Sequence, residues 1–324
     1  MTSSTTSLLA PVEHDLQILT DNLKQLIGAR HPILGAAAEH LFEAGGKRIR
    51  PALVLLASRA TMPDHDLTNR HRRLAEITEM IHTASLVHDD VVDEADLRRN
   101  VETVNNLFGD KIAVLAGDFL FAQSSWYLAN LDNLQVVKLL SEVIRDFAEG
   151  EIIQSINRFD IHASIDSYLD KTYYKTASLM ANSAKAAAVL SDANAEVAEN
   201  LYDYGRNLGL AFQIVDDILD FTGSTEVLGK PAGLDLKSGK LTSPVFYALQ
   251  QQPYLEVLIE REFSEPEDLN EALTLIRDSD GIEQARQLAK DLARQAAQSL
   301  NCLAASDSKD ALHELTNHAV SRLY

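Results

Sequence analysis

Cysteine is almost absent from this 324-residue sequence, where Cys302 is the single example. A lone cysteine excludes a disulfide within the chain and a metal site built from several thiolates, which fits a reducing compartment. Basic residues are also scarce, because 29 Lys and Arg stand against 48 Asp and Glu and give a net charge of −19. A general nucleic-acid or anionic-membrane binder needs a basic surface, so we expect neither partner.

Long apolar runs are missing as well. No stretch approaches the roughly 20 apolar residues of a membrane-spanning helix. Residues 1–16 lack both the basic region of a signal peptide and the arginines of a transit peptide. We therefore expect no transmembrane segment and a cytoplasmic location. Apolar residues nevertheless make up 46% of the chain, which is enough for a large buried core.

Strand-like alternation of apolar and polar residues is hard to find, whereas helical periodicity recurs along most of the chain. Gly and Pro stand mainly between the periodic segments, where they break helices. The pattern predicts an all-α fold, a single large bundle of ten or more helices that forms one domain over residues 1–324. One long connection, residues 222–244, contains four glycines, two prolines and three lysines, a composition typical of a functional loop.

Two copies of the pattern D-D-x-x-D stand at the ends of apolar helical segments. Carboxylates at spacing i,i+4 share one helix face and repel each other unless a cation joins them. Such oxygen ligands suit Mg²⁺, which binds through one or two carboxylates plus waters and substrate phosphates. The bulky apolar flanks in "LVHDDVV" and "FQIVDDILDF" favour a pocket over a solvated helix end. The acidic candidates are Asp89, Asp90 and Asp93 in the first copy and Asp216, Asp217 and Asp220 in the second.

Basic and polar groups accompany these acids. The stretch "EAGGKRIRPAL" places Lys47, Arg48 and Arg50 at the start of a helix with Pro51 in its first turn, where exposed amides bind anions. Further candidates follow the first motif, lie near the second or belong to the glycine-rich loop: Arg98, Arg99, Lys175, Thr176, Gln213, Lys230 and Lys240. Together with the acids they indicate a metal-bridged diphosphate beside a second, metal-free anion site.

The sequence is similar to the trans-isoprenyl diphosphate synthases, and most like the long-chain solanesyl and octaprenyl diphosphate synthases. The motifs agree in order from "GGKRIRP" to "KSGKLTSP", roughly two-thirds of the chain. The resemblance implies the isoprenoid synthase fold, with helices around a central cavity, three Mg²⁺ ions per active site and a homodimer. Its substrates would be isopentenyl diphosphate and an allylic diphosphate, farnesyl or geranylgeranyl diphosphate.

The resemblance also implies a role for each candidate. Asp89, Asp93 and Asp216 would bind Mg²⁺, and the other motif aspartates and Lys175 would complete the catalytic set. The allylic diphosphate would contact Arg98, Lys175, Thr176, Gln213, Lys230 and Lys240, and isopentenyl diphosphate would contact Lys47, Arg50, His82 and Arg99. His82 lies two turns before Asp89, although a histidine inside "EMIHTASLV" could also be a core residue.

The expected chemistry follows from charge. Mg²⁺ and the Arg and Lys groups stabilise the departing diphosphate of the allylic substrate, and the double bond of isopentenyl diphosphate attacks the resulting carbocation. The resemblance suggests that the released diphosphate takes the proton lost at the end, in keeping with the lack of an obvious dedicated base. Asn100 replaces the glycine that often follows the Arg-Arg pair in the family, which affects the turn after the helix.

Small side chains precede the first motif. Family members that stop at short products tend to carry a bulky aromatic residue four or five positions before the first aspartate, where this chain has Ser85 and Ala84. A helix from about Arg70 to Asp89 gives roughly 28 Å of tunnel wall. We therefore expect a C40–C50 product for quinone side chains. Candidates for the tunnel floor, each with core packing as its expected role, are Phe119, Phe121, Trp126 and Tyr127.

Three other functions stay open as alternatives. A farnesyl or geranylgeranyl diphosphate synthase would share the motifs and differ in product length. A class I terpene cyclase also ionises a diphosphate with Mg²⁺, but it usually carries an Asn/Ser/Glu pattern at its second metal site and needs no site for isopentenyl diphosphate. A non-catalytic subunit of a heteromeric synthase commonly lacks motif aspartates, and all six are present here.

Overall fold

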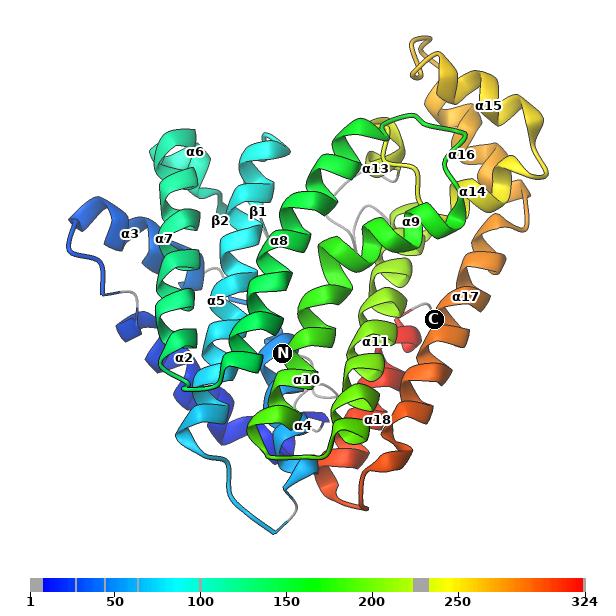
Figure 1. Cartoon of the computed structure of the whole chain (residues 1–324). Coiled ribbons are helices and arrows are strands. Elements are labelled where there is room, and N and C mark those ends of the chain that lie inside the picture. The colour runs from blue at the N-terminus through cyan, green and yellow to red at the C-terminus, as the bar shows by residue number, and fades with distance from the viewer. Residues whose placement is uncertain are drawn as a thin grey trace. The chain divides into compact units, whose positions relative to one another are not determined.

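The computed structural model describes residues 8–26, 28–43, 45–62, 64–98, 101–223 and 233–322. Helices make up most of this described chain, and its only strands are an antiparallel pair of two residues each (Figure 1). The predicted all-α fold is confirmed. A single domain over residues 1–324 stays a prediction, because the chain divides into two compact units.

The first unit consists of Met1–Ile144, Asn182–Tyr202 and Leu300–His313. The elements that lie wholly within it are η1 (Ala10–Val12), α2 (Glu13–Leu26), α3 (Pro32–Glu43), α4 (Ile49–Thr61), α5 (Asn69–Val92), β1 (Leu97–Arg98), β2 (Val101–Glu102), α6 (Val104–Phe108), α7 (Asp110–Ala129) and η3 (Leu300–Cys302).

The second unit consists of Arg145–Ala181, Asp203–Ser299 and Glu314–Tyr324. Its own elements are α9 (Ile165–Thr172), η2 (Tyr173–Ala177), α13 (Leu234–Lys237), α14 (Ser243–Leu249), α15 (Pro253–Glu260), α16 (Asp268–Asp278) and α17 (Gly281–Ser299). Four of the five boundaries between the units fall inside further helices, α8 (Leu134–Ile156), α10 (Ser178–Leu190), α11 (Ala195–Thr222) and α18 (Asp307–Ser321).

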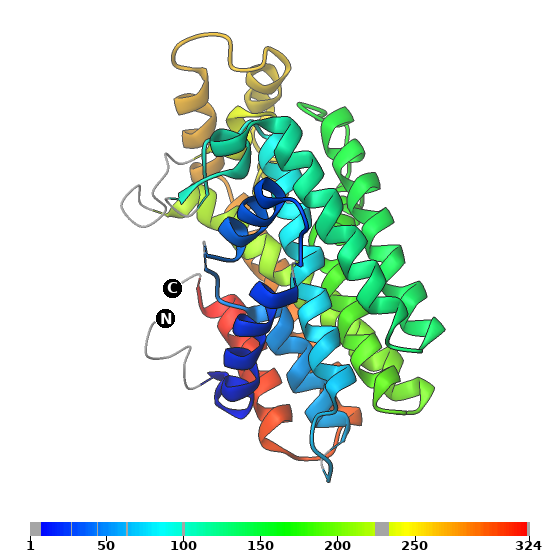
Figure 2. The same cartoon turned by 90° about the vertical axis from the view of Figure 1, so that its left-hand side faces the viewer.

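Helix α5 is the centre of the first unit. It packs along α4 and α7, and α5 and α7 run side by side in both views (Figures 1 and 2). Gly117 of α7 faces His88 of α5, and a Cβ atom at this position would lie 2.2 Å from the Nε2 atom of the histidine. The missing side chain therefore lets the two helices approach closely and lets the imidazole donate to the carbonyl oxygen of Val114 (3.1 Å).

A buried histidine ties three segments of this unit together. Thr68 precedes α5 and forms a reciprocal cap with His71, whose Nδ1 atom accepts a hydrogen bond from the Thr68 N–H (3.3 Å). The Nε2–H group of His71 donates to the hydroxyl of Ser191 (3.2 Å), which also accepts from the hydroxyl of Thr61 (2.8 Å). Burial, with help from two neighbouring arginines, lowers the pKa of His71 to about 4, so the ring is neutral.

The second unit has its core around the C-terminal half of α11. The buried apolar residues of this segment, Ile214, Val215, Ile218 and Phe221, pack with side chains from α9 and from α14 to α17. Residues Tyr173–Ala177 form a π-helical turn, η2, a feature that occurs frequently at functional sites. Gly209 lets α11 approach this turn, because a Cβ atom there would lie 2.7 Å from the Cα atom of Ala177.

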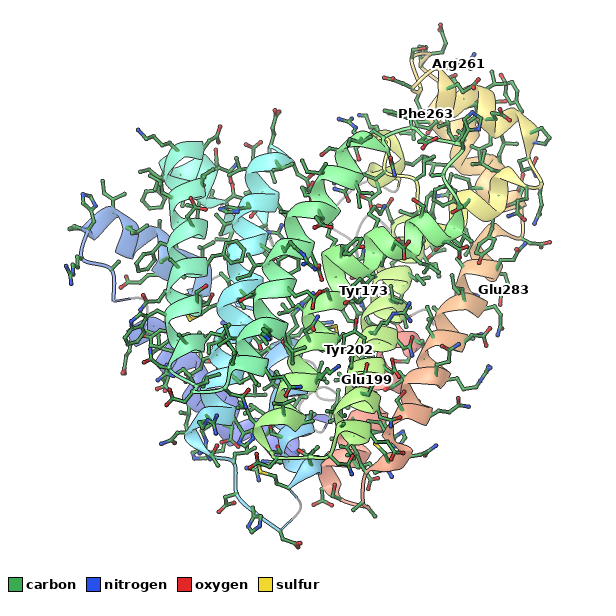
Figure 3. All side chains as sticks on the ribbon, viewed as in Figure 1. Tyr173, Glu199, Tyr202, Arg261, Phe263 and Glu283 are labelled. Atoms are coloured by element: carbon green, nitrogen blue, oxygen red, sulfur yellow. The ribbon has the colours of Figure 1, made fainter. Side chains whose placement is uncertain are left out.

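One surface lysine in the first unit connects two helices. Glu199 and Tyr202 lie on α11, about one turn apart (Figure 3). The ammonium group of Lys185, on α10, donates to the carboxylate of Glu199 and lies 5.1 Å from the ring centroid of Tyr202. The Glu199 side chain of this pair is 57% exposed.

Helix α7 bears on two expectations. Among the described helices, α7 alone is long and apolar enough to cross a membrane, a test that an ordinary core helix also passes, so the absence of a transmembrane segment stays a prediction. The expected core role is wrong for Trp126, which is 61% exposed because it lies away from the buried face that carries Ala116 and Leu120. The other floor candidates are half-buried: Phe119, Phe121 and Tyr127.

Candidate active site

The first acidic motif lies at the C-terminal end of α5. Asp89 is half-buried and Asp90 is buried, while Asp93 is exposed and caps the helix, its N–H bonded to the Asp89 carbonyl oxygen (2.8 Å). The C-terminal end of a helix carries partial negative charge, so acidic side chains there are unfavourable without a cation. The position of the motif at a helix C-terminus is therefore a second reason, besides the repulsion between its carboxylates, to expect a bound cation.

Arg98 supplies part of that charge. Its Nε atom lies 2.9 Å from both carboxylate oxygens of Asp90, and its Nη2 atom lies 2.7 Å from Oδ1. The turn between α5 and β1, where the Ala95 N–H bonds to the Asp90 carbonyl oxygen (2.9 Å), brings Arg98 back to α5. Arg98 itself lies in β1 of a short hairpin with β2 that the sequence pattern did not predict. Asp90 is therefore held by an arginine, whereas Asp89 and Asp93 stay the candidate metal ligands of this motif.

A cavity of about 40 Å³ lies beside this ion pair. Its polar lining includes His40, Arg48, Glu79, His82, Asp90 and Arg98. His82 is half-buried and lines the cavity, so it is not a core residue. Its Nε2 atom accepts a hydrogen bond from the Nη1 atom of Arg50 (3.0 Å), which places two candidates for the second diphosphate side by side.

The Lys-Arg-x-Arg element meets α5 through a buried ion pair that sequence reasoning missed. Arg48 stands before the first turn of α4 in the left-handed backbone conformation (φ 52°). Its guanidinium group donates to the carboxylate of Glu79, and the two side chains are 10% and 7% exposed. Lys47, by contrast, is exposed and does not line the cavity.

The second acidic motif lies near the end of α11, and Asp217 is its buried member. Its Oδ2 atom accepts from the hydroxyl of Tyr168 (2.5 Å), and its Oδ1 atom accepts from the amide of Gln213 (2.9 Å). Gln213 in turn accepts a hydrogen bond from the hydroxyl of Thr176 (3.0 Å). Burial raises the pKa of Asp217 to about 7, against the effect of these hydrogen bonds. Thr176, Gln213 and Asp217, all predicted site residues, thus form one chain of hydrogen bonds.

Asp216 and Asp220 differ in their partners. Asp216 forms an ion pair with the Nη2 atom of Arg322 (2.6 Å), at the end of α18. The Oδ2 atom of Asp220 is buried without a hydrogen-bond partner. Burial and the nearby carboxylate of Asp235 raise the pKa of Asp220 to about 6. An orphaned carboxylate oxygen of this kind is a ready acceptor for a cation.

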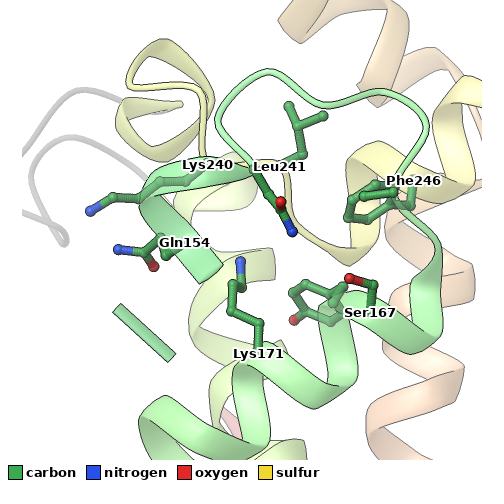
Figure 4. Close-up of a pocket in the computed structure, with 9 residues that line it drawn as sticks. Gln154, Ser167, Lys171, Lys240, Leu241 and Phe246 are labelled. Carbon is green, nitrogen blue, oxygen red and sulfur yellow. The ribbon is translucent and has the colours of Figure 1, made fainter. Parts of the chain in front are cut away.

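Lys175 lies in the π-helical turn η2. Its ammonium group donates to the carboxylate of Glu151 on α8 (2.6 Å). Lys240 lines a small pocket with Lys171 and Gln154, all three of which are visible in Figure 4. Sequence reasoning named Lys175 and Lys240 but neither Glu151 nor Lys171, because single charged residues inside helices carry no pattern of their own.

The donor set fits Mg²⁺. Within the described residues, no three His, Cys, Asp or Glu side chains gather closely enough to hold a metal ion alone. Mg²⁺ does not need such a cage, because it usually binds through one or two carboxylates, several waters and the phosphates of a substrate. Asp89 and Asp93 at one helix end, and Asp216 and Asp220 at another, provide ligand sets of this size.

The remaining predictions concern product length and unplaced residues. Ala84 is fully buried, and Ser85 is half-buried with its hydroxyl bonded to the carbonyl oxygen of His82 (2.9 Å). Both side chains are small, as the product-length argument requires. Arg99, Lys230 and residues 224–232 of the glycine-rich loop lie outside the described residues.

Comparison with known proteins identifies the family of this chain. The sequence model of the Polyprenyl synthetase family matches residues 31–276. A prenyl transferase from Synechocystis sp. is 69% identical over 99% of both chains. Solanesyl diphosphate synthase 2 of Arabidopsis thaliana, named as chloroplastic, is 55% identical over 98% of this chain and 77% of its own length.

Solved structures show the same fold. The polyprenyl synthase from Caulobacter crescentus CB15, complexed with calcium and isoprenyl diphosphate, superposes with a TM-score of 0.91. It shares 36% sequence identity and covers 100% of this chain and 99% of its own. The chain therefore belongs to the polyprenyl synthetase family and is a prenyltransferase with the all-α isoprenoid synthase fold.

Proposed function

We propose that the protein is a Mg²⁺-dependent trans-polyprenyl diphosphate synthase that adds isopentenyl diphosphate repeatedly to an allylic primer, farnesyl or geranylgeranyl diphosphate. The observation that carries this proposal is the similarity of the protein to a solanesyl diphosphate synthase, which is 55% identical over 98% of the chain. The product is an all-trans C40–C50 chain for quinone side chains. The carboxylates at two helix ends and the cations beside them supply the chemistry that the reaction needs.

Three Mg²⁺ ions per active site are part of the proposal. Asp89 and Asp93 bind metal at the end of α5, and Asp216 binds metal on α11. Asp90 serves instead to anchor Arg98, since both of its oxygens accept from that guanidinium group.

The other two acids of the second motif act in support. Asp217 fixes the amide of Gln213, which also accepts from Thr176. Asp220 has a buried oxygen without a hydrogen-bond partner, which is available to accept from a cation.

Two anion sites hold the substrates. The allylic diphosphate is bound by Arg98, Lys175, Thr176, Gln213, Lys230 and Lys240, and the diphosphate of isopentenyl diphosphate by Lys47, Arg50, His82 and Arg99. The hydrogen bond between Arg50 and His82 supports the second set, because it places the two groups side by side and His82 lines the cavity. Glu151 keeps the ammonium group of Lys175 in place.

The proposed reaction is an ionisation followed by an addition. When bound, Mg²⁺ neutralises the diphosphate and lowers the barrier to its departure. Lys175 and Lys240 hold the departing diphosphate, and their ammonium groups stabilise the negative charge that develops on it. Arg50 and His82 hold isopentenyl diphosphate so that its double bond attacks the allylic cation, and positioning of this kind supplies much of the acceleration. The released diphosphate takes the proton.

A long product follows from the small side chains before Asp89. Ala84 and Ser85 place no aromatic ring in that stretch of α5, so a growing chain is not stopped there. A farnesyl or geranylgeranyl diphosphate synthase differs only in this respect, and a class I terpene cyclase would release a cyclic hydrocarbon from allylic diphosphate alone. Incubation with and without isopentenyl diphosphate separates all three.

We further propose a homodimer. Apolar side chains of the first unit stand exposed on α7 and at the start of α8, with Leu115, Trp126 and Leu134 at 48%, 61% and 70% exposure. Exposed apolar surface of this kind favours a partner, and oligomers of identical chains are most often two-fold dimers. The cytoplasmic location expected from the sequence stays a prediction.

The test uses the purified protein with Mg²⁺, farnesyl diphosphate and isopentenyl diphosphate. Asp89→Asn and Asp93→Asn should each lower kcat by about a hundredfold or more, because they remove a charge that the leaving group needs. Asp96→Asn is the matched control, since Asp96 is an exposed acid three residues further along. Equal activity of Asp89→Asn and Asp96→Asn would contradict the assignment of the first motif.

A further inference from the structure

Lys171 is a half-buried cation with no assigned role. It lies in the last turn of α9, directly before the π-helical turn that carries Lys175. Its ammonium group lies 5.3 Å from the ring centroid of Tyr168, the residue whose hydroxyl donates to Asp217. Lys171 therefore stands beside the second acidic motif without belonging to any sequence pattern.

A pocket joins Lys171 to a residue of the proposed diphosphate site. The pocket is lined by Gln154, Asn157, Ala163, Ser167, Tyr168, Lys171, Lys240, Leu241 and Phe246. Figure 4 shows the Lys171 side chain extending from α9 toward Gln154, with Lys240 on the far side of that amide. Two ammonium groups and two amides thus face one small space, and among the described residues no carboxylate lines it.

Two charged side chains near Lys171 already have partners of their own. Lys175 is paired with Glu151, and both oxygens of Asp217 accept from Tyr168 and Gln213. Lys171 forms no ion pair with any carboxylate of the chain that the structure describes. Burial lowers the pKa of Lys171 and the nearby lysines add to this shift, while the carboxylates of Asp217 and Asp235 oppose it. A desolvated ammonium group is costly unless an anion joins it.

We propose that Lys171 is a further cation of the allylic diphosphate site and that it binds, with Lys240, a phosphate group that enters this pocket. The inference rests on the proposed function and names one more residue for it. A phosphate fits because its oxygens accept from ammonium and amide groups alike, and both line the pocket. The same chemistry serves the diphosphate of the substrate and the diphosphate released after ionisation.

The test measures anion binding and turnover separately. Sodium diphosphate is titrated calorimetrically, with Mg²⁺ present, into the wild-type protein and the variants Lys171→Gln, Lys171→Arg and Lys237→Gln. Lys237 is the matched control, because it is an exposed lysine three residues before Lys240. Lys171→Gln should bind diphosphate about ten- to a hundredfold more weakly, the loss expected for one charge-assisted hydrogen bond. Lys171→Arg should retain most of the affinity, and Lys237→Gln all of it.

Steady-state kinetics then distinguish the sources of the anion. In Lys171→Gln the KM for farnesyl diphosphate should rise while the KM for isopentenyl diphosphate stays unchanged. Unaltered diphosphate affinity in Lys171→Gln would overturn the inference, even if the wild-type protein makes prenyl product. If the wild-type protein makes no product but loses diphosphate affinity on Lys171→Gln, the anion pocket stands and the proposed function fails.

Discussion

The buried ion pair between Arg48 and Glu79 allows the sharpest prediction about stability. The two side chains are 10% and 7% exposed, so water cannot solvate either charge if the other one is removed. Breaking a buried pair typically costs about 3–5 kcal/mol, because an uncompensated charge stays behind. Arg48→Met should therefore lower the free energy of unfolding by about 3 kcal/mol or more, a large part of an ordinary protein's stability.

The double variant tests the reasoning. Arg48→Met with Glu79→Leu removes both charges and should cost less than Arg48→Met alone, since no buried charge is left unpaired. Urea unfolding of the wild-type protein, both single variants and the double variant gives the coupling free energy between the two side chains. The exposed pair of Lys185 and Glu199 is the control, and Lys185→Met should cost about 1 kcal/mol or less.

The same variants have a functional readout. Arg48 stands between Lys47 and Arg50, and its contact with α5 fixes the path of the chain before α4. Arg48→Met should raise the KM for isopentenyl diphosphate more than the KM for the allylic primer. A loss of stability below about 1 kcal/mol in Arg48→Met, or additive effects in the double variant, would refute the account of this pair.

Three further predictions follow from individual contacts. Ala84→Phe should shorten the product, read by mass spectrometry, and should cost about 1–3 kcal/mol of stability because Ala84 is fully buried; unchanged length would defeat the tunnel argument. The pKa of His71 is about 4 in the folded protein against 6.5 for the free side chain, so the unfolded chain takes up the proton first and stability falls as pH drops from about 6.5 toward 4. His71→Gln should flatten this pH dependence of the urea midpoint, and an identical slope would contradict it. Arg322→Gln removes the ion pair to Asp216 and should tighten Mn²⁺ binding about two- to fivefold, measured by electron paramagnetic resonance without substrate; weaker binding would show that Arg322 does not compete.

The helices were predictable where periodicity is strong. A helix was expected from about Arg70 to Asp89, and α5 runs from Asn69 to Val92. The hairpin of β1 and β2 was not, because strands of two residues are too short to show alternation. The π-helical turn at Tyr173–Ala177 was also missed, since one extra residue in a helical turn leaves the apolar pattern almost unchanged.

The candidate site was predictable in its residue types but not in its pairings. The sequence motifs named Asp90, Arg98 and Asp216, yet the spacing could not show that Arg98 turns back onto Asp90 or that Arg322 reaches Asp216 from the end of the chain. Such contacts depend on how distant segments fold together. Lys171 carried no signal at all, because a single lysine on a helix usually lies on the surface.

The most direct test of the central claim is the mass spectrum of the product made by the purified wild-type protein from Mg²⁺, farnesyl diphosphate and isopentenyl diphosphate. The account predicts a series of linear prenyl diphosphates that ends between C40 and C50 and that disappears when Mg²⁺ is removed with a chelator. A cyclic hydrocarbon, or no prenyl product from the protein alone, would contradict it.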